Sequence, residues 1–170
     1  NHESRAMTEH FTFREEVLNK YDGDESIYEC FIESFESMPI AADVNGDYLC
    51  MHGGISPLMR SSKDIDKINR FEEPPMKGLF CDLLWSDPLD DKKARRKTFV
   101  DNAARQCSYE YGLAPVKHVL ESGNYNSILR AHQLKHDGYD AHRWGGANAW
   151  PTVVTLFSAP NYEQAGNKGA

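Results

Sequence analysis

The stretch that decides the fold is GDYLCMHGG, residues 46–54, in which a turn, a short apolar run and a glycine pair follow one another. Gly46 and Asp47 are typical of a turn, and residues 48–51 are typical of a short buried strand. The glycine pair ends this strand and lets other groups approach His52 closely, because glycine has no side chain. We therefore expect His52 to stand at the end of a rigid strand.

Two other apolar runs also end in polar residues. SILRAH, residues 127–132, ends in His132, and VVTLFSAPNY, residues 153–162, runs out into polar residues that include Tyr162. Ligand sites often gather where strands end, because the strands position the side chains and the loops leave them accessible. If these strands are neighbours in one sheet, His52 and His132 meet at one rim, where neutral imidazoles suit Zn, Fe, Ni or Cu.

The remaining segments read as helices and connections. We expect helices over residues 8–20, 26–38, 61–71 and 114–124, a loop over 72–78, and a charged connection over 89–99 that leads into a helix near 98–104. Ser26 and Glu29 have the spacing of a capping box, and Gly123 has the position of a C-cap. Because strands and helices mix along the chain, the expected class is α/β or α+β.

The composition limits the class of protein. The chain has 170 residues, 40% hydrophobic and 26% charged, with a formal net charge of −7, which is typical of one globular domain. The acidic balance argues against general nucleic-acid binding, which needs a basic surface. No apolar run approaches the roughly 20 residues of a membrane span. The cysteines (Cys30, Cys50, Cys81 and Cys107) form no C-x-x-C pair. Cys30, Cys50 and Cys81 lie in or beside apolar runs, as reduced packing cysteines do, so we expect a cytoplasmic location, with entry into the nucleus left open.

Each candidate site residue has an ordinary structural alternative. A single histidine after a strand is more often a hydrogen-bonded structural residue than a ligand, and a second one at a matching strand end improves the odds only modestly. Asn1, His2 and Glu3 form a polar run that is weak support for a metal ligand beside a general acid. The guanidinium of Arg105 can fork onto a phosphate, although most arginines are solvated. The other histidines that we expect on helix faces or in loops are His10, His118, His136 and His142.

Six short motifs follow one another along the chain. They are NHES at 1–4, MHGGISP at 51–57, RFEEPP at 70–75, LLWSDP at 83–88, SILRAHQ at 127–133 and FSAPNY at 157–162. Together and in this order they make the chain resemble the metal-dependent Ser/Thr phosphoprotein phosphatase family. The stretches 8–16, 70–91 and 161–170 are most similar to the calcineurin branch of that family, in its catalytic subunit.

The resemblance implies a central β-sandwich flanked by helices, with two metal ions at one rim, Fe and Zn or the common substitute Mn. It implies that a water activated by the two metals hydrolyses phosphoserine and phosphothreonine. It also assigns roles to the matching residues: Asn1, His52 and His132 as ligands of one metal, His2 as the general acid, Arg105 as a phosphate-binding residue, and Tyr162 as a residue at the mouth of the site.

The ligands of the second metal do not occur in the sequence. The family's Gly-Asp-x-His-Gly and Gly-Asp-x-Val-Asp-Arg-Gly motifs, which precede its Asn-His-Glu motif, are absent from residues 1–170. We therefore expect residues 1–170 to be the C-terminal portion of a single catalytic domain, incomplete in this chain and inactive alone. The resemblance also implies an EF-hand regulatory subunit and calmodulin, which would bind through segments outside the chain. Gln106 stands where the family usually has Gly after the arginine.

The expected function is that of a protein serine/threonine phosphatase that acts on phosphoprotein substrates. Two alternatives stay open. One is a truncated, non-catalytic interaction module, against which the retained site residues argue. The other is a related two-metal phosphoesterase that acts on nucleotides or diesters, although the LLWSDP and SAPNY motifs favour the protein phosphatase.

Overall fold

Two compact units make up the computed structural model, which describes all residues from Asn1 to Ala170. The first unit comprises Asn1–Pro39 and Asn69–Pro75, and the second comprises Ile40–Ile68 and Met76–Ala170. Strands and helices are mixed, as the sequence predicts. The expectation that residues 1–170 form part of one catalytic domain stays a prediction.

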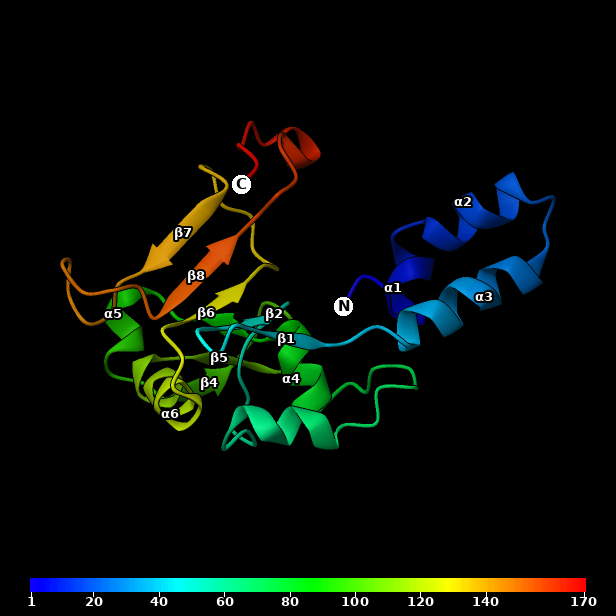
Figure 1. Cartoon of the computed structure of the whole chain (residues 1–170). Coiled ribbons are helices and arrows are strands. Elements are labelled where there is room, and N and C mark those ends of the chain that lie inside the picture. The colour runs from blue at the N-terminus through cyan, green and yellow to red at the C-terminus, as the bar shows by residue number, and fades with distance from the viewer. The chain divides into compact units, whose positions relative to one another are not determined.

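The first unit contains three helices: α1 (Arg5–His10), α2 (Phe13–Lys20) and α3 (Glu25–Glu36) (Figure 1). The expected single helix over 8–20 is wrong, because Thr12 adopts a left-handed conformation at φ 69° and separates α1 from α2. The expected capping box at Ser26 is also wrong, since Asp24 is the N-cap of α3 and its carboxylate accepts a hydrogen bond from the Ser26 N–H. Tyr28 is fully buried, and its hydroxyl lies 2.8 Å from Thr8 Oγ1, so α3 is tied to α1.

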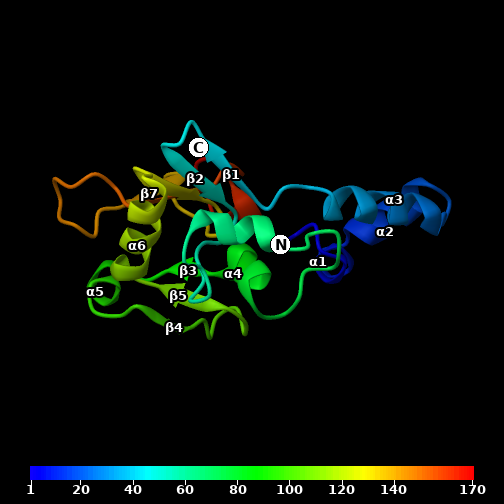
Figure 2. The ribbon, with the colours of Figure 1, turned by 60° about the horizontal axis from the view of Figure 1, so that its bottom comes forward.

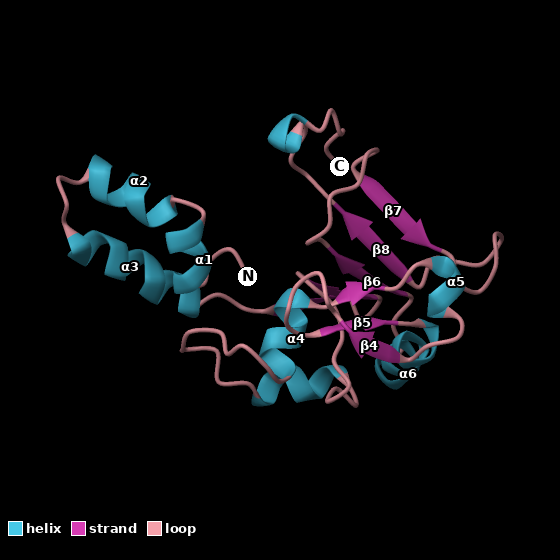
Figure 3. Ribbon diagram, turned by 180° about the vertical axis from the view of Figure 1, so that it is seen from behind, coloured by secondary structure: helices cyan, strands magenta, loops and turns pink.

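A five-stranded sheet forms the centre of the second unit, in the order β1-β2-β6-β8-β7. Its strands are β1 (Ala41–Val44), β2 (Tyr48–Met51), β6 (Ser127–Arg130), β7 (Tyr139–His142) and β8 (Val153–Leu156). β2, β6 and β8 run parallel, so their C-terminal ends lie at the same edge of the sheet. Figures 1 and 3 show β6 and β8 pointing in the same direction. The expectation that the strands before His52 and His132 are neighbours is therefore confirmed.

A second, three-stranded sheet has the order β3-β5-β4. Its strands are β3 (Asp87–Pro88), β4 (Phe99–Asp101) and β5 (Tyr109–Tyr111). The expected helix near 98–104 is wrong, because this segment is β4, which pairs antiparallel with β5.

The helical elements of the second unit are η1 (Ser62–Lys67, a 3-10 helix), α4 (Leu79–Trp85), α5 (Asp91–Ala94), α6 (Leu113–Gly123) and η2 (Tyr162–Gln164, a 3-10 turn) (Figure 2). The C-cap of α6 is Asn124 at φ 57°, so the expected cap at Gly123 is wrong by one residue. None of the helices has both the length and the apolar character that crossing a bilayer requires.

The core of the second unit lies between the sheets and α6. Leu49 of β2, Ile128 of β6 and Val153 of β8 pack with Val116 and Val119 of α6, and all five are at most 2% exposed. Burial of these apolar side chains fixes the register of the parallel strands, because a slip of one residue would turn each of them to the opposite face.

The cysteines match their expected role only in part. Cys81 is buried and all four cysteines are free thiols, as expected, but Cys30 is exposed on α3. The helical spacing therefore predicted a buried position for Cys30, whereas Cys30 lies on the exposed face of α3.

His142 corrects another expectation, since it is a buried residue of strand β7 and lies neither on a helix face nor in a loop. Its Nε2 lies 3.1 Å from Thr155 Oγ1, and its ring packs on the buried Trp144. Burial, as the largest cause, lowers the pKa of His142 to about 4 from an ordinary value of 6.5. The fold therefore holds this imidazole in its neutral form.

We predict that His142 makes the chain less stable in mild acid. Between pH 6.5 and about 4 the unfolded state binds a proton that the folded state does not, so stability falls as the pH is lowered through this window, by up to about 3 kcal/mol. Urea unfolding between pH 4 and 7.5 should show a shallower decline in His142→Gln than in the parent. His118→Gln, at an exposed position of α6, should keep the parent's decline. Equal pH dependence in the parent and His142→Gln would contradict the assignment.

Candidate active site

Two histidines meet where β2 and β6 end. His52 follows β2 and His132 follows β6, and the facing atoms, His52 Nε2 and His132 Nδ1, are 3.1 Å apart. Both side chains are half-buried. The Trp85 ring stands edge-on to His132 with the centroids 5.4 Å apart. The predicted meeting of the two imidazoles at one rim is therefore confirmed.

The backbone at His132 is strained. Its φ is 61°, in the left-handed region that a residue with a side chain adopts only at a cost of about 1–2 kcal/mol. Such strain persists where surrounding contacts hold the backbone, and it often marks a functional site. The bend turns the chain out of β6 just where the imidazole meets His52.

The glycine pair after His52 has a steric reason. A Cβ at Gly53 would lie 2.7 Å from the backbone of Leu84 and Trp85, and a Cβ at Gly54 would lie 2.2 Å from the Tyr111 ring. The absence of side chains thus brings α4 and β5 directly against the turn. The glycines therefore allow the close approach that the sequence predicts, at the two positions that directly follow His52.

A buried ion cluster centred on Asp87 lies behind the histidines. Asp87 Oδ1 accepts a hydrogen bond from Arg130 Nη2 at 2.9 Å. Asp87 Oδ2 accepts one from Arg105 Nε at 2.9 Å and one from Asn102 Nδ2 at 3.0 Å. The Asp87 side chain is 5% exposed. Two guanidinium groups share one carboxylate, so the cluster carries a surplus positive charge that favours an anion.

Arg130 is one of three members of this cluster, with Asp87 and Asn102, that the sequence did not single out as site residues. It is 2% exposed, and besides Asp87 it donates to the Gly53 carbonyl from Nε at 2.6 Å and to the Ser86 carbonyl from Nη2 at 3.1 Å. Burial, as the largest cause, lowers the pKa of Arg130. The only signal in the sequence was that Arg130 lies in the motif at 127–133, which also contains His132, while Asp87 lies in the motif at 83–88.

Arg105 joins the cluster to the histidine pair. Besides its bond to Asp87, it donates from Nη2 to the His132 carbonyl at 3.0 Å. Its side chain is 29% exposed, and a guanidinium has five N–H donors, so donors remain for a bound anion. Gln106, which stands where the family usually has Gly, has a φ of 60°, a conformation that glycine adopts at least cost.

The other predicted site residues lie elsewhere in the chain. Asn1 is 5% exposed, and its side-chain oxygen is buried without a hydrogen-bond partner, as suits a metal ligand. His2 is exposed and stacks on Phe11 with the centroids 4.8 Å apart. Both belong to the first unit, so their combination with the histidine pair stays a prediction. Tyr162 begins η2 and packs edge-on against Phe157, and its place at the mouth of the site also stays a prediction.

The donor set fits part of a metal site. Two imidazole nitrogens face each other on strained, anchored backbone, and imidazole is a good ligand for Zn, Fe and Cu. No three histidine, cysteine or carboxylate side chains in the structure gather as a complete metal site. The chain therefore supplies a partial ligand set.

Comparison with known proteins decides the family. The calcineurin-like phosphoesterase family matches residues 1–136, most of the chain. The chain belongs to this family. The resemblance seen in the six sequence motifs is confirmed.

Individual relatives of the chain are named as Ser/Thr protein phosphatases. The serine/threonine-protein phosphatase 2B catalytic subunit A1 of Saccharomyces cerevisiae is 40% identical over 95% of the chain, and the chain spans 31% of that protein. The phosphatase 4 catalytic subunit of the same yeast is 38% identical, and the chain spans 48% of it. The chain thus spans 31% to 48% of the length of these relatives.

A solved structure agrees with this placement. A yeast protein serine/threonine phosphatase with similarity to human phosphatase PP5 matches with a TM-score of 0.81 and 33% identity, over 98% of this chain and 48% of that one. The expected metallophosphatase fold, only part of which this chain contains, is therefore confirmed.

We predict that Asp87→Asn strongly destabilises the fold. The amide would leave the buried Arg130 guanidinium without its counter-charge, which typically costs about 3–5 kcal/mol. Asp91→Asn, at an exposed position in α5, should change stability by no more than about 0.5 kcal/mol. Urea unfolding at neutral pH measures both. A loss in Asp87→Asn as small as in Asp91→Asn would show that the cluster does not hold the site together.

Proposed function

We propose that the protein containing this chain is a serine/threonine protein phosphatase that hydrolyses phosphoserine and phosphothreonine monoesters. The observation that carries the proposal is the anchored pair of facing imidazoles beside a phosphate-competent arginine. The names of the relatives support the substrate class, since each is a Ser/Thr protein phosphatase.

In this proposal His52 and His132, together with Asn1, hold one of two metal ions, which are Fe and Zn or Mn. When bound, the metals supply a nucleophilic water at neutral pH and neutralise charge on the phosphoryl group. The chain contributes fixed ligands, because the Arg105 guanidinium holds the His132 carbonyl and the Arg130 guanidinium holds the Gly53 carbonyl. Because the fold already holds these ligand side chains in position, less conformational entropy is lost when they bind a metal.

Arg105 and His2 have the roles that act on substrate. Arg105 uses two N–H groups on Asp87 and His132, and its remaining donors bind the phosphoryl oxygens as charge accumulates there. His2, in its protonated form, gives its proton to the departing serine or threonine oxygen. Tyr162 lines the mouth through which the phosphorylated segment enters.

The partners follow from the proposed relationship to phosphatase 2B. The substrates are phosphoproteins, and an EF-hand regulatory subunit and calmodulin bind through segments outside Asn1–Ala170. The location is the cytoplasm, with access to the nucleus. The net charge of −7 supports the proposal that nucleic acid is not a partner.

The histidine pair gives the direct test of function. In the longest natural protein that contains this chain, His52→Asn and His132→Asn should each lower Mn-dependent hydrolysis of para-nitrophenyl phosphate and of a phosphoserine peptide by at least about 100-fold. Metal content, measured by mass spectrometry, should fall in parallel. His136→Asn, at an exposed histidine, serves as the control. Unchanged turnover in both site variants would refute the proposal.

A second assay separates the alternatives. We predict that residues 1–170 alone turn over para-nitrophenyl phosphate at least about 1,000-fold more slowly than the longest natural protein, because one metal's ligands cannot replace a coupled pair. Inactivity of both would favour the interaction module. Preference of the longer protein for bis-para-nitrophenyl phosphate would favour a diesterase, and comparable turnover by the short chain would contradict the incomplete-site account.

A further inference from the structure

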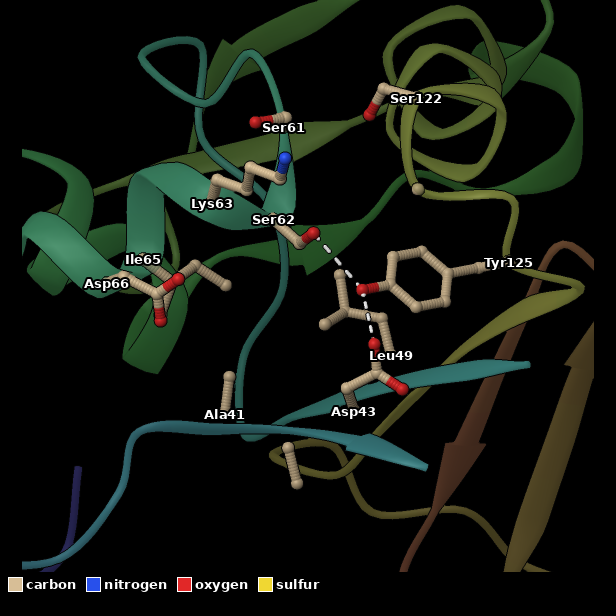
Figure 4. A pocket seen from close by; sticks show the side chains of 12 residues that line it. Ala41, Asp43, Leu49, Ser61, Ser62, Lys63, Ile65, Asp66, Ser122 and Tyr125 are labelled. Atoms are coloured by element: carbon tan, nitrogen blue, oxygen red, sulfur yellow. Dashed lines mark hydrogen bonds between the residues drawn. The ribbon is translucent and has the colours of Figure 1, made fainter. Parts of the chain in front are cut away.

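A pocket of about 580 Å³ lies at the β1 edge of the large sheet, between β1, η1 and the C-terminal end of α6 (Figure 4). Its volume falls within the usual range of ligand pockets. Leu49 and Ile65 give it an apolar floor, and the Tyr125 ring forms one wall. None of its residues belongs to the proposed catalytic site.

Two carboxylates of the pocket have no cationic partner. Asp43 and Asp66 line it, and neither forms an ion pair in the structure. The Tyr125 hydroxyl donates to Asp43 Oδ2 at 2.8 Å and lies 3.1 Å from Ser62 Oγ, whose hydroxyl can donate to it. The Gly46 N–H donates to Asp43 Oδ1 at 2.7 Å. Asp43 is thus held in place by neutral donors, and its charge is not balanced.

The charge of the pocket selects a cation with an apolar stem. The last carbonyls of α6 add negative potential at Ser122 and Gly123. Lys63 is the one basic lining residue, and in Figure 4 its side chain extends toward Ser61 rather than toward Asp43. An arginine side chain matches this arrangement, since its methylenes can lie on Leu49 while its guanidinium bridges carboxylates.

The neighbouring strand offers a way to present such a side chain. β1 is at the end of the sheet and pairs with β2 alone. No backbone group of residues 41–43 makes a hydrogen bond outside that pairing. Asp43 is opposite Leu49 in the ladder, so a strand added beside β1 would place every second side chain on the face of the pocket.

We propose that this edge binds an extended, arginine-bearing segment of a partner protein, which adds a strand to β1 and inserts its arginine between Asp43 and Asp66. Backbone hydrogen bonds to β1 supply affinity, and the pocket supplies selectivity. The competing explanation is that Asp43 is an inward-pointing charge that only guards the edge against strand pairing. The two explanations predict opposite outcomes in a binding experiment.

The probe is a fluorescein-labelled peptide, Ser-Val-Thr-Arg-Thr-Val-Ser-amide, titrated with the longest natural protein that contains this chain and followed by anisotropy. The same peptide with citrulline, the neutral isostere of arginine, should bind at least about tenfold more weakly. Acetyl-arginine amide, which cannot form a strand, should compete only at far higher concentration. Equal binding of the arginine and citrulline peptides, or no saturable binding, would overturn the proposal in favour of the edge guard.

Variants locate the site. Asp43→Asn and Asp66→Asn should each weaken binding about fivefold, whereas Lys63→Gln should strengthen it about twofold by removing a competing cation. Asp137→Asn, whose carboxylate is outside the pocket, should bind as the parent does. If Asp43→Asn fails to fold, Asp66→Asn and Lys63→Gln still decide. Parent-like binding in both of these would refute the proposed pocket.

Discussion

The carboxylate of Asp87 shared between Arg105 and Arg130 is the interaction on which the site depends. Both guanidinium groups also hold backbone carbonyls, Arg130 at Gly53 and Arg105 at His132. The cluster therefore connects the turns that follow β2 and β6 with the start of β3. A buried charge cluster of this kind is sensitive to the loss of any member, because each remaining charge would be left uncompensated.

This ion cluster explains why backbone strain and close packing both occur around the histidine pair. His132 is held at a φ of 61°, and the energy of that conformation must come from contacts made elsewhere. The bond from Arg105 to the His132 carbonyl and the packing of Trp85 on its ring are two such contacts. The absence of a side chain at Gly53 lets α4 pack closely against the turn that follows β2 and contains His52. The histidine pair is thus positioned by backbone anchors as well as by the strands.

The parts of the fold that a local sequence pattern encodes were predictable. The strands before His52 and His132 were predictable, because short apolar runs ending in a polar residue have a local signature. β3, β4 and β5 were not, since strands of two or three residues carry no periodicity. The burial of Arg130 was also unpredictable, because it depends on partners at Gly53 and Ser86 that are distant in the sequence. The break between α1 and α2 was not predictable either, because it depends on the left-handed backbone of one residue, Thr12, inside a helical sequence pattern.

The central claim is that the ion cluster holds the histidine pair in the geometry of metal ligands, and a double-mutant cycle on metal affinity tests it most directly. Cobalt(II) binding would be measured by absorption in the parent, Arg105→Lys, His132→Asn and the double variant. If Arg105 acts by holding His132, Arg105→Lys weakens binding in the parent but has no further effect beside His132→Asn, a coupling of at least about 1 kcal/mol. Additive effects of the two substitutions would contradict the account.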